Sequence, residues 1–357
     1  MSMAEPRPAP TRDAAPPAAA STTAHAATAA PPAATVPAAG TATAGAVATS
    51  KAATSTAATA AAGAATATRA AALSPTPQLT WRLLERGPGQ IPISAEELSR
   101  AADPAFSGAR GRGVRVCIVD SGVEGEHPLV GEIKGSWAVV KEGTELVVRP
   151  VEHHDACGHG TACASVVRRV APECEIYSVK VLGERFSGTG AMLLAGLRWA
   201  VEQGFDVINM SLSTTRTRYA DELRALTDQA FFQRSVIVAS AHNTPVESFP
   251  WRFSSVISVG SHGEDDADLH LYNPNPPVEF FAKGNNVQVG WLGGSTLRTT
   301  GNSFATPYIA GLCARILSRY PKMTVFQVKG ALYLAAANVH VDHVRGTHVV
   351  ETGGAPS

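Results

Sequence analysis

From residue 115 to residue 337 the chain alternates short apolar runs rich in Val and Ile with longer segments of helical periodicity. Short β-branched runs favour strands, whereas apolar residues spaced three and four apart favour helices. The expected strands cover 115–119, 175–182, 205–212, 235–240 and 256–259, and the expected helices cover 190–202, 219–234, 306–319 and 325–337. Strands that alternate with helices build βαβ units, so we expect an α/β fold with a mostly parallel central sheet and helices on both faces.

The beginning of the chain has a composition that predicts disorder. Only six of the first 80 residues are charged, and no Phe, Tyr or Trp precedes Trp81. A segment made of Ala, Thr, Pro, Gly and Ser buries too little apolar surface to offset its ordering entropy. The expected organisation is a disordered Ala/Pro/Thr-rich segment at 1–78, a lead-in segment at 79–112, an α/β domain at 113–341 and a C-terminal tail at 342–357. In the lead-in segment, the capping-box spacing of Ser94 and Glu97 predicts a short helix that ends before Pro104.

Charge and hydropathy argue against two classes of partner. The formal net charge is zero and the calculated pI is about 7.2, so neither nucleic acid nor an anionic membrane surface is favoured. No run of about 18 consecutive apolar residues occurs, which argues against a membrane-spanning helix. The chain also shows no basic region followed by a Leu/Val-rich stretch, so a standard secretory signal is not visible.

The cysteines predict free thiols. They are Cys117, Cys157, Cys163, Cys174 and Cys313. Their odd number and irregular spacing argue against a disulfide framework, and Cys117 and Cys313 lie in apolar runs where small buried residues are expected. Free thiols suit a reducing compartment. We therefore expect a cytoplasmic protein, with secretion through an unrecognised signal as the alternative.

Three short motifs carry groups that can perform chemistry. Asp120 follows an expected strand, His159 lies between two glycines, and Ser303 opens an expected helix. Taken singly, such residues have ordinary explanations. A nucleotide-binding protein can have an Asp after a strand, and a Ser at the start of a helix is often only a cap. Taken together, they supply a nucleophile, a base and a group that orients the base, which is what acyl transfer needs.

The order Asp, His, Ser along the chain is that of the subtilases, the subtilisin-like serine proteases. The chain resembles this family over about 113–339, and the segments 177–183 and 206–212 match strands typical of it. The resemblance implies that the α/β domain is catalytic. The triad that it implies is Asp120, His159 and Ser303.

The resemblance also implies an oxyanion donor and a substrate groove. Asn243 would donate its side-chain amide to the oxyanion, together with the backbone N–H of Ser303. A peptide substrate would lie as an added strand between two edges of the protein. One edge is Ser187, Gly188 and Thr189, and the other is Ser211, Leu212 and Ser213. The pocket for the P1 side chain, which precedes the cleaved bond, would have walls at 211–214 and at 240–243, the second wall containing Ser240, Ala241 and His242.

Several residues near these motifs lead to further expectations. Ser213 and His242 stand where the family usually has Gly, so the pocket should prefer small or polar P1 side chains. Asn302 replaces a Thr common in the family and is considered as a second side-chain donor to the oxyanion. Pro307 is expected in the first turn of the helix opened by Ser303, where a missing N–H does no harm.

No metal or cofactor is expected. The run 153–159 contains three His, one Asp and one Cys, but it lacks the paired ligand spacings of common zinc sites. Secreted subtilisins insert a calcium-binding loop after the helix of the catalytic His. Between His159 and Val179 this chain has no Asp, Asn or Gln to serve as calcium ligands. Cys163, one helical turn after His159, is expected to pack beneath the imidazole.

The intact triad favours a serine endopeptidase that acts as a monomer on a restricted set of peptides or proteins. One alternative is a subtilase-fold acyl transferase that passes the acyl group to an amine, as peptide macrocyclases do. Such enzymes usually carry an insertion near the active site, and none of size is visible. The other alternative is a non-catalytic peptide-binding module, which a missing triad residue would favour, and none is missing.

Overall fold

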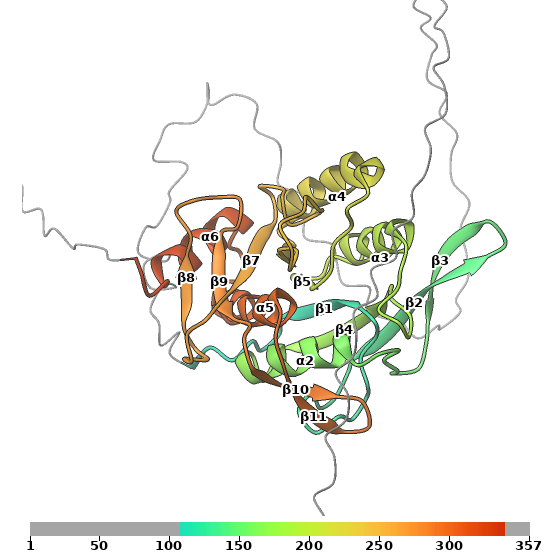
Figure 1. Ribbon diagram of the computed structural model, residues 1–357, viewed down its shortest axis with the longest axis horizontal. Helices are drawn as coiled ribbons and strands as arrows, with labels where there is room; N and C mark the ends of the chain where they lie inside the picture. Colours follow the sequence, from blue (N-terminus) through green and yellow to red (C-terminus); the bar gives the residue numbers. More distant parts are fainter. Residues whose placement is uncertain (1–107, 340–357) are drawn as a thin grey trace, which may run out of the picture. The chain divides into compact units, whose positions relative to one another are not determined.

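The computed structural model describes residues 108–339, which form a nine-stranded sheet with helices on both faces (Figure 1). The strands of this sheet are β1 (Arg115–Asp120), β2 (Gly135–Glu142), β3 (Glu145–Pro150), β4 (Glu175–Lys180), β5 (Val207–Met210), β6 (Val236–Ser240), β7 (Ile257–His262), β8 (His270–Tyr272) and β9 (Phe280–Lys283). The helices are α2 (His159–Val170), α3 (Gly190–Glu202), the short 3-10 helix η3 (Thr217–Tyr219), α4 (Ala220–Gln233), α5 (Asn302–Arg319) and α6 (Val325–Leu334). A separate hairpin consists of β10 (Val287–Trp291) and β11 (Ser295–Thr299).

The strand order β3-β2-β4-β1-β5-β6-β7-β9-β8 determines where a ligand can bind. All neighbours from β2 to β9 are parallel, and only the edge strands β3 and β8 are antiparallel, which confirms the expected mostly parallel α/β fold. Strand β4 lies on one side of β1 and β5 lies on the other, so the winding direction reverses at β1. Open α/β sheets bind ligands beyond the carboxyl ends of their strands at such a reversal, and the carboxyl end of β1 is Asp120.

Strand β1 is buried on both faces. Val116 and Ile118 enter an apolar core shared with α2, α5 and α6, while Cys117 and Val119 enter a second core shared with α3 and α4. This alternation follows from the pleat of a strand, in which successive side chains point to opposite faces. Because both faces are covered, the middle of β1, residues 116–119, is an unbroken apolar run instead of an alternating one.

The expected elements around the motifs are confirmed, and the missed ones lie at the periphery. The expected strands correspond to β1, β4, β5, β6 and β7, and the expected helices correspond to α3, α4, α5 and α6, with boundary shifts of a few residues. The strands that the sequence did not predict are β2, β3, β8, β9, β10 and β11. Most residues of β3 and β11 are only partly buried or exposed, so their sequences contain no long apolar run. The disordered segment at 1–78 and the short helix after Ser94 lie outside the described residues.

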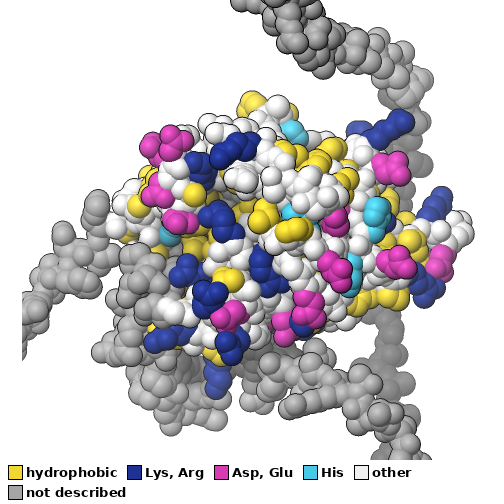
Figure 2. All heavy atoms as spheres, turned by 90° about the horizontal axis from the view of Figure 1, so that it is seen from below, with side chains coloured by type: hydrophobic (Ala, Val, Ile, Leu, Met, Phe, Trp, Pro, Cys, Tyr) yellow, Lys and Arg dark blue, Asp and Glu magenta, His cyan; other side chains and the backbone are white. Residues whose placement is uncertain are grey.

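The cysteines and the surface can be compared with the expectations drawn from composition and charge. All five cysteines are free thiols, as expected, and all are buried, which the sequence did not predict for Cys157 and Cys174. The face of the molecule drawn in Figure 2 mixes basic, acidic and apolar side chains. In the part of the chain that the structure describes, no helix combines the length and the apolar character needed to cross a membrane. The expected absence of nucleic-acid and membrane partners stays a prediction.

The beginning of α2 lies directly against the end of β1. A Cβ atom added at Gly160 would lie 1.9 Å from the carbonyl oxygen of Gly122 and 3.3 Å from Cβ of Asp120. A distance of 1.9 Å to a backbone atom cannot be relieved by turning a side chain. The glycine therefore permits the close approach that brings His159 to Asp120.

We predict that Gly160→Ala destabilises the fold by about 1–3 kcal/mol, because the added methyl group forces α2 away from β1. Urea unfolding followed by circular dichroism measures this loss as a lower midpoint at an unchanged m-value. Gly263→Ala is the matched control, since a Cβ at Gly263 has no atom within 4 Å. Equal midpoints for the two variants would contradict the prediction.

Candidate active site

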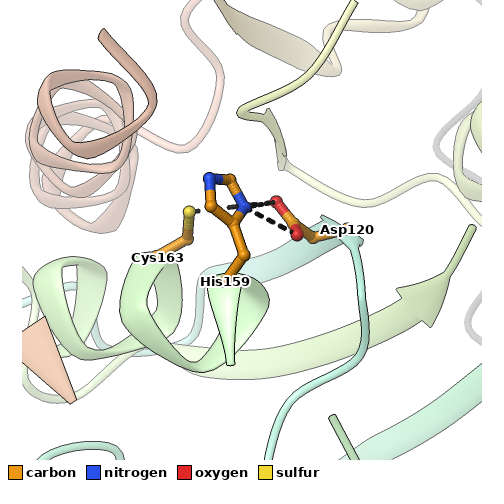
Figure 3. A group of neighbouring side chains, drawn as sticks. All are labelled: Asp120, His159 and Cys163. Carbon is orange, nitrogen blue, oxygen red and sulfur yellow. Dashed lines mark hydrogen bonds and ion pairs between the residues drawn. The ribbon is translucent and has the colours of Figure 1, made fainter. Parts of the chain in front are cut away.

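Asp120 and His159 form a direct side-chain pair at the carboxyl edge of the sheet (Figure 3). His159 is the first residue of α2, and its Nδ1 lies 2.8 Å from Oδ1 and 2.9 Å from Oδ2 of Asp120. The carboxylate is fully buried and also accepts the backbone N–H of Ser121 at 2.7 Å. With Nδ1–H donating to Asp120, the other ring nitrogen of His159 is the basic one.

Burial and charge act on His159 in opposite directions. Burial of the ring lowers the pKa of His159, whereas the negative charge of Asp120 and the hydrogen bond to it raise that pKa. The net result is a pKa raised from the ordinary value of 6.5. A buried carboxylate beside an imidazole thus stabilises the protonated ring.

The loop before α2 holds His159 in place through one buried carboxylate, that of Asp155. Its oxygens accept five hydrogen bonds, from Ser121 Oγ at 2.7 Å, Cys157 N at 3.0 Å, Gly158 N at 2.8 Å, Thr161 N at 2.7 Å and Thr161 Oγ1 at 2.6 Å. One of these donors, the backbone N–H of Thr161, belongs to the first turn of α2 and has no acceptor inside the helix, and two others come from the residues just before the helix. Asp155 therefore fixes where the helix begins and so where its first side chain points.

Ser303 is the second residue of α5, and its hydroxyl donates to the backbone oxygen of Ser211 at 3.1 Å. The expectation that Pro307 lies in the first turn of this helix is wrong, because α5 begins at Asn302 and Pro307 is its sixth residue. The proline has no N–H to offer the carbonyl of Ser303 four residues earlier. Instead, Ser211 Oγ donates to that carbonyl at 2.8 Å, and Cys163 Sγ lies 3.6 Å from it.

Asn302 has a different role from the one expected. Its amide nitrogen Nδ2 donates to the backbone oxygens of Ala241 at 3.1 Å and of His242 at 3.3 Å, which uses both of its hydrogens. Its Oδ1 accepts from N and Oγ of Ser261 at 2.9 and 2.8 Å. The idea that Asn302 supplies a second oxyanion donor is therefore wrong. The backbone N–H of Asn302 instead donates to Oδ1 of Asn243 at 2.9 Å, which orients that amide.

The predicted substrate residues surround a hollow of about 310 Å³ beside Ser303 and His159. Those that line it are Gly188, Thr189, Ser211, Leu212, Ser213, Ser240, Ala241, His242 and Asn243. Two predicted residues do not line it. Asp120 is buried behind His159, and Ser187 is exposed, with its backbone oxygen accepting the N–H of Gly183 at 2.9 Å.

The hollow also has walls that the sequence reasoning missed. These are Leu182, Phe186, Gly190 and Leu193, whereas Thr214 lines the hollow as part of the expected wall at 211–214. Phe186 is an apolar residue in an otherwise polar loop, and that was its one visible signal. In the wall at 211–214, Ser213 Oγ donates to Ser248 Oγ at 3.0 Å, and Ser248 in turn accepts from Trp251 Nε1 at 2.8 Å. The hollow thus has both apolar and polar walls.

Comparison with known proteins places this fold and these motifs in one family. The model of the subtilase family matches residues 111–348. The chain belongs to the subtilase family. It is 30% identical to Subtilisin DY of Bacillus licheniformis over 257 residues, which cover 68% of this chain and 90% of that protein. It is also 30% identical to Subtilisin E of Bacillus subtilis (strain 168) over 252 residues, which cover 66% of this chain and 64% of that protein.

Solved structures agree on the fold. A cold-adapted subtilisin-like serine proteinase matches with a TM-score of 0.51 at 24% identity, over 62% of this chain and 82% of the other. Sphericase matches over the same shares with a TM-score of 0.53 at 22% identity. Membership in this family of serine proteases supports a hydrolase activity for the chain.

One group of side chains in this subtilase has the donor atoms of a metal site. Among residues 108–339, Asp120, His159 and Cys163 are the one such group, with ligand atoms within 4.8 Å of one another (Figure 3). Burial and the charge of Asp120 raise the pKa of the Cys163 thiol well above its ordinary value, whereas metals bind the thiolate. In the segment after α2, where secreted subtilisins bind calcium, the carboxylate of Glu173 is ion-paired with Arg110 and Arg112. The absence of a metal cofactor stays a prediction.

We predict that the pKa of His159 lies above 6.5 and falls below it in Asp120→Asn, because the substitution removes the charge that raises the pKa and leaves the burial that lowers it. An NMR titration of the imidazole resonance, assigned with His159→Gln, measures both values. The amide resonances of α4 in the same spectra control for global changes of the fold. A pKa of His159 that does not move in Asp120→Asn would refute the assigned cause.

Proposed function

We propose that this subtilase is a serine endopeptidase that hydrolyses peptide bonds through an acyl-enzyme on Ser303. The observation that carries the proposal is the bidentate contact of the His159 ring with the buried carboxylate of Asp120, beside the same hollow that Ser303 lines. A nucleophile, an oriented base and a hollow lined by residues of both expected substrate edges therefore coincide. Family membership supports the same chemistry.

In the proposed mechanism, Ser303 Oγ attacks the carbonyl carbon while Nε2 of His159 takes its proton. Asp120 stabilises the imidazolium that forms and keeps the ring in the correct tautomer. The imidazolium then gives the proton to the leaving amine, and a water molecule hydrolyses the ester by the reverse steps. Because the hydroxyl donates to Ser211 O in the absence of substrate, a rotation about its side-chain bond must precede the attack.

The oxyanion of the tetrahedral intermediate would be stabilised by Asn243 and the start of α5. The Oδ1 of Asn243 is held by the backbone N–H of Asn302, so its NH₂ group is left for the oxyanion. The backbone N–H of Ser303 lies in the first turn of α5, where it has no acceptor within the helix. The positive end of the helix dipole adds to this stabilisation.

The substrate would bind as an extended strand between 187–189 and 211–213. Its P1 side chain would enter the hollow between the walls that contain Ser213, Ser240 and His242. The hydrogen bond from Ser213 to Ser248 ties the first of these walls to the segment between β6 and β7. A pocket of this kind favours side chains that are small or can form hydrogen bonds.

We predict that Ser303→Ala and His159→Ala each abolish peptide hydrolysis, with losses on the order of a millionfold in kcat. This magnitude comes from subtilisin, where the triad residues act as a unit. The measurement is single-turnover hydrolysis of a fluorogenic peptide mixture, together with labelling of the wild-type protein by a fluorophosphonate. Retention of more than about a tenth of the wild-type rate in Ser303→Ala would refute the serine mechanism.

The same experiment separates the alternatives. Absence of fluorophosphonate labelling at Ser303 in the folded wild-type protein would favour a binding module. Labelling of Ser303, combined with transfer of a peptide's acyl group to an added amine by the unlabelled protein with little free acid, would favour a transferase. Free acid as the main product, identified by mass, supports the endopeptidase.

We predict that Asn302→Ala lowers kcat roughly tenfold with little change in KM, because it frees the segment 241–243 and so loosens the oxyanion donor. Asn243→Ala is expected to cost a hundred- to a thousandfold, the magnitude known for subtilisin. Since Asn302 acts through Asn243, the double variant should be no slower than Asn243→Ala alone. Multiplying losses in the double variant would contradict this coupling.

We predict a preference for Ala, Ser or other small or polar residues at P1 over Phe and Leu. The reason is that Ser213 and His242 add volume and polar atoms to the walls of the pocket. Hydrolysis of a peptide library that varies P1, read by mass spectrometry, measures the preference, and Ser213→Gly should increase the rate for large P1 residues. A wild-type profile in which peptides with aromatic P1 residues are hydrolysed fastest would contradict the prediction, because the pocket would then accept large side chains.

A further inference from the structure

The β10–β11 hairpin lies outside the nine-stranded sheet and packs against α2 (Figure 1). A hairpin of two strands is at best marginally stable by itself, so its place depends on contacts with the rest of the protein. The strand β11 ends at Thr299, shortly before the proposed nucleophile Ser303. The hairpin therefore joins the helix that begins with His159 to the start of the helix that carries Ser303.

Trp291, the last residue of β10, lies against the residue that precedes His159. A Cβ atom added at Gly158 would lie 2.7 Å from Cε2 and 2.8 Å from Cδ2 of the Trp291 ring. Gly158 is also the N-cap of α2, with a φ of +89° that residues with a side chain rarely adopt. The indole ring thus fills the space beside Gly158 and limits where the backbone before His159 can move.

Both residues that flank His159 are therefore in close contact with other parts of the protein. Gly160 lies against the backbone that follows β1, and Gly158 lies against Trp291. A backbone that is held on both flanks leaves little freedom to the side chain between them. The position of the ring relative to the Asp120 carboxylate depends on this restraint, and small errors in the placement of a catalytic group are costly in rate.

The turn of the hairpin is fixed by Glu124, in the loop after β1. The carboxylate of Glu124 accepts the backbone N–H groups of Gly293 at 2.8 Å and of Gly294 at 3.0 Å. Hydrogen bonds to a charged acceptor are stronger than those between neutral groups. The backbone N–H of Glu124 itself donates to Thr161 Oγ1, on α2, at 2.9 Å. One residue thus holds both the hairpin turn and the first turn of the helix.

Two further hydrogen bonds hold the strands of the hairpin. His127 Nδ1 accepts the N–H of Leu129 at 3.1 Å, so Nε2 carries the hydrogen and donates to Ser295 O at 2.9 Å. On the side of α2, the backbone N–H of Gly290 donates to Ser165 Oγ at 2.9 Å. The loop after β1, the hairpin and α2 are therefore joined to one another by directional contacts.

We propose that Trp291 is a positioning residue for His159, and that Glu124 keeps Trp291 in place by fixing the turn of the β10–β11 hairpin. Neither residue lines the hollow beside Ser303, so both act through the backbone before His159. The inference rests on the proposed function for the role of His159 as the base. It adds two residues outside the triad that determine how well the imidazole meets Asp120.

The test compares substitutions at Trp291 and Glu124 with a matched control. Trp291→Ala removes the ring, and Trp291→Phe puts a smaller aromatic ring in its place. Glu124→Gln keeps the size of the side chain and loses the charge and one acceptor oxygen. Glu126→Gln is the control for the charge, because Glu126 is an exposed residue of the same loop and forms no hydrogen bond or ion pair within residues 108–339.

For peptide hydrolysis we expect Trp291→Ala to lower kcat about tenfold or more and Glu124→Gln to lower it at least about threefold, with KM changed by less than about twofold. Trp291→Phe should recover most of the loss, and Glu126→Gln should leave kcat unchanged. Since Glu124 acts through Trp291, adding Glu124→Gln to Trp291→Ala should cost little more. A wild-type kcat in Trp291→Ala, or losses that multiply in the double variant, would overturn the inference.

The pKa of His159, measured by NMR titration, is a second readout that needs no peptide cleavage. Loss of burial alone would raise this pKa, whereas a weaker contact with Asp120 would lower it. We expect the pKa of His159 to fall in Trp291→Ala and in Glu124→Gln and to stay unchanged in Glu126→Gln. An unchanged or raised pKa in Trp291→Ala would overturn the inference.

The two readouts separate this inference from the proposed function. A pKa of His159 that falls as expected, in a protein that cleaves no peptide, supports the positioning role and defeats the endopeptidase proposal alone. Peptide cleavage with kcat and the pKa of His159 both independent of Trp291 defeats the positioning role alone. Circular dichroism checks that each variant is folded, and if Trp291→Ala does not fold, the same two measurements on Glu124→Gln decide.

Discussion

The buried contact between Asp120 and His159 is the interaction on which the rest of the site depends. A carboxylate with no exposure to water is stable as a charge only when hydrogen bonds surround it, and here the imidazole and the backbone N–H of Ser121 provide them. The contact requires α2 to begin within touching distance of β1. Gly160 and the five hydrogen bonds accepted by Asp155 together make that approach possible.

A second set of contacts ties the nucleophile to the sheet. Pro307 leaves the carbonyl of Ser303 without its helical donor, and side chains from the end of β5 and from α2 occupy that place. Asn302 then joins the start of α5 to the segment after β6 and to β7. Segments that are distant in the chain are therefore tied to the start of α5 beside Ser303, which is the preorganisation that electrostatic stabilisation of an oxyanion requires.

The core of the fold could be predicted because buried segments are apolar, and an apolar run is visible in the sequence. A strand such as β1, covered on both faces, is apolar on both faces in its middle, and the run at 116–119 is visible without a structure. Peripheral strands such as β3 and β11 are largely exposed or only partly buried, and their sequences contain no long apolar run. The residues Asp120, His159 and Ser303 could be selected for the same reason, since each follows or opens a predictable element.

What the sequence alone determined was the fold class, the order of the elements and the three motifs, because these depend on periodicity and on neighbours within a few residues. The tertiary structure decided which partner each polar group takes. The amide of Asn302 could have faced the oxyanion and instead binds Ala241 and His242, 61 and 60 positions earlier in the chain. Phe186 meets His159 only because the turn after β4 folds back over the sheet edge. Directional hydrogen bonds and ring contacts between distant segments depend on the relative placement of whole elements, and no local pattern encodes that placement.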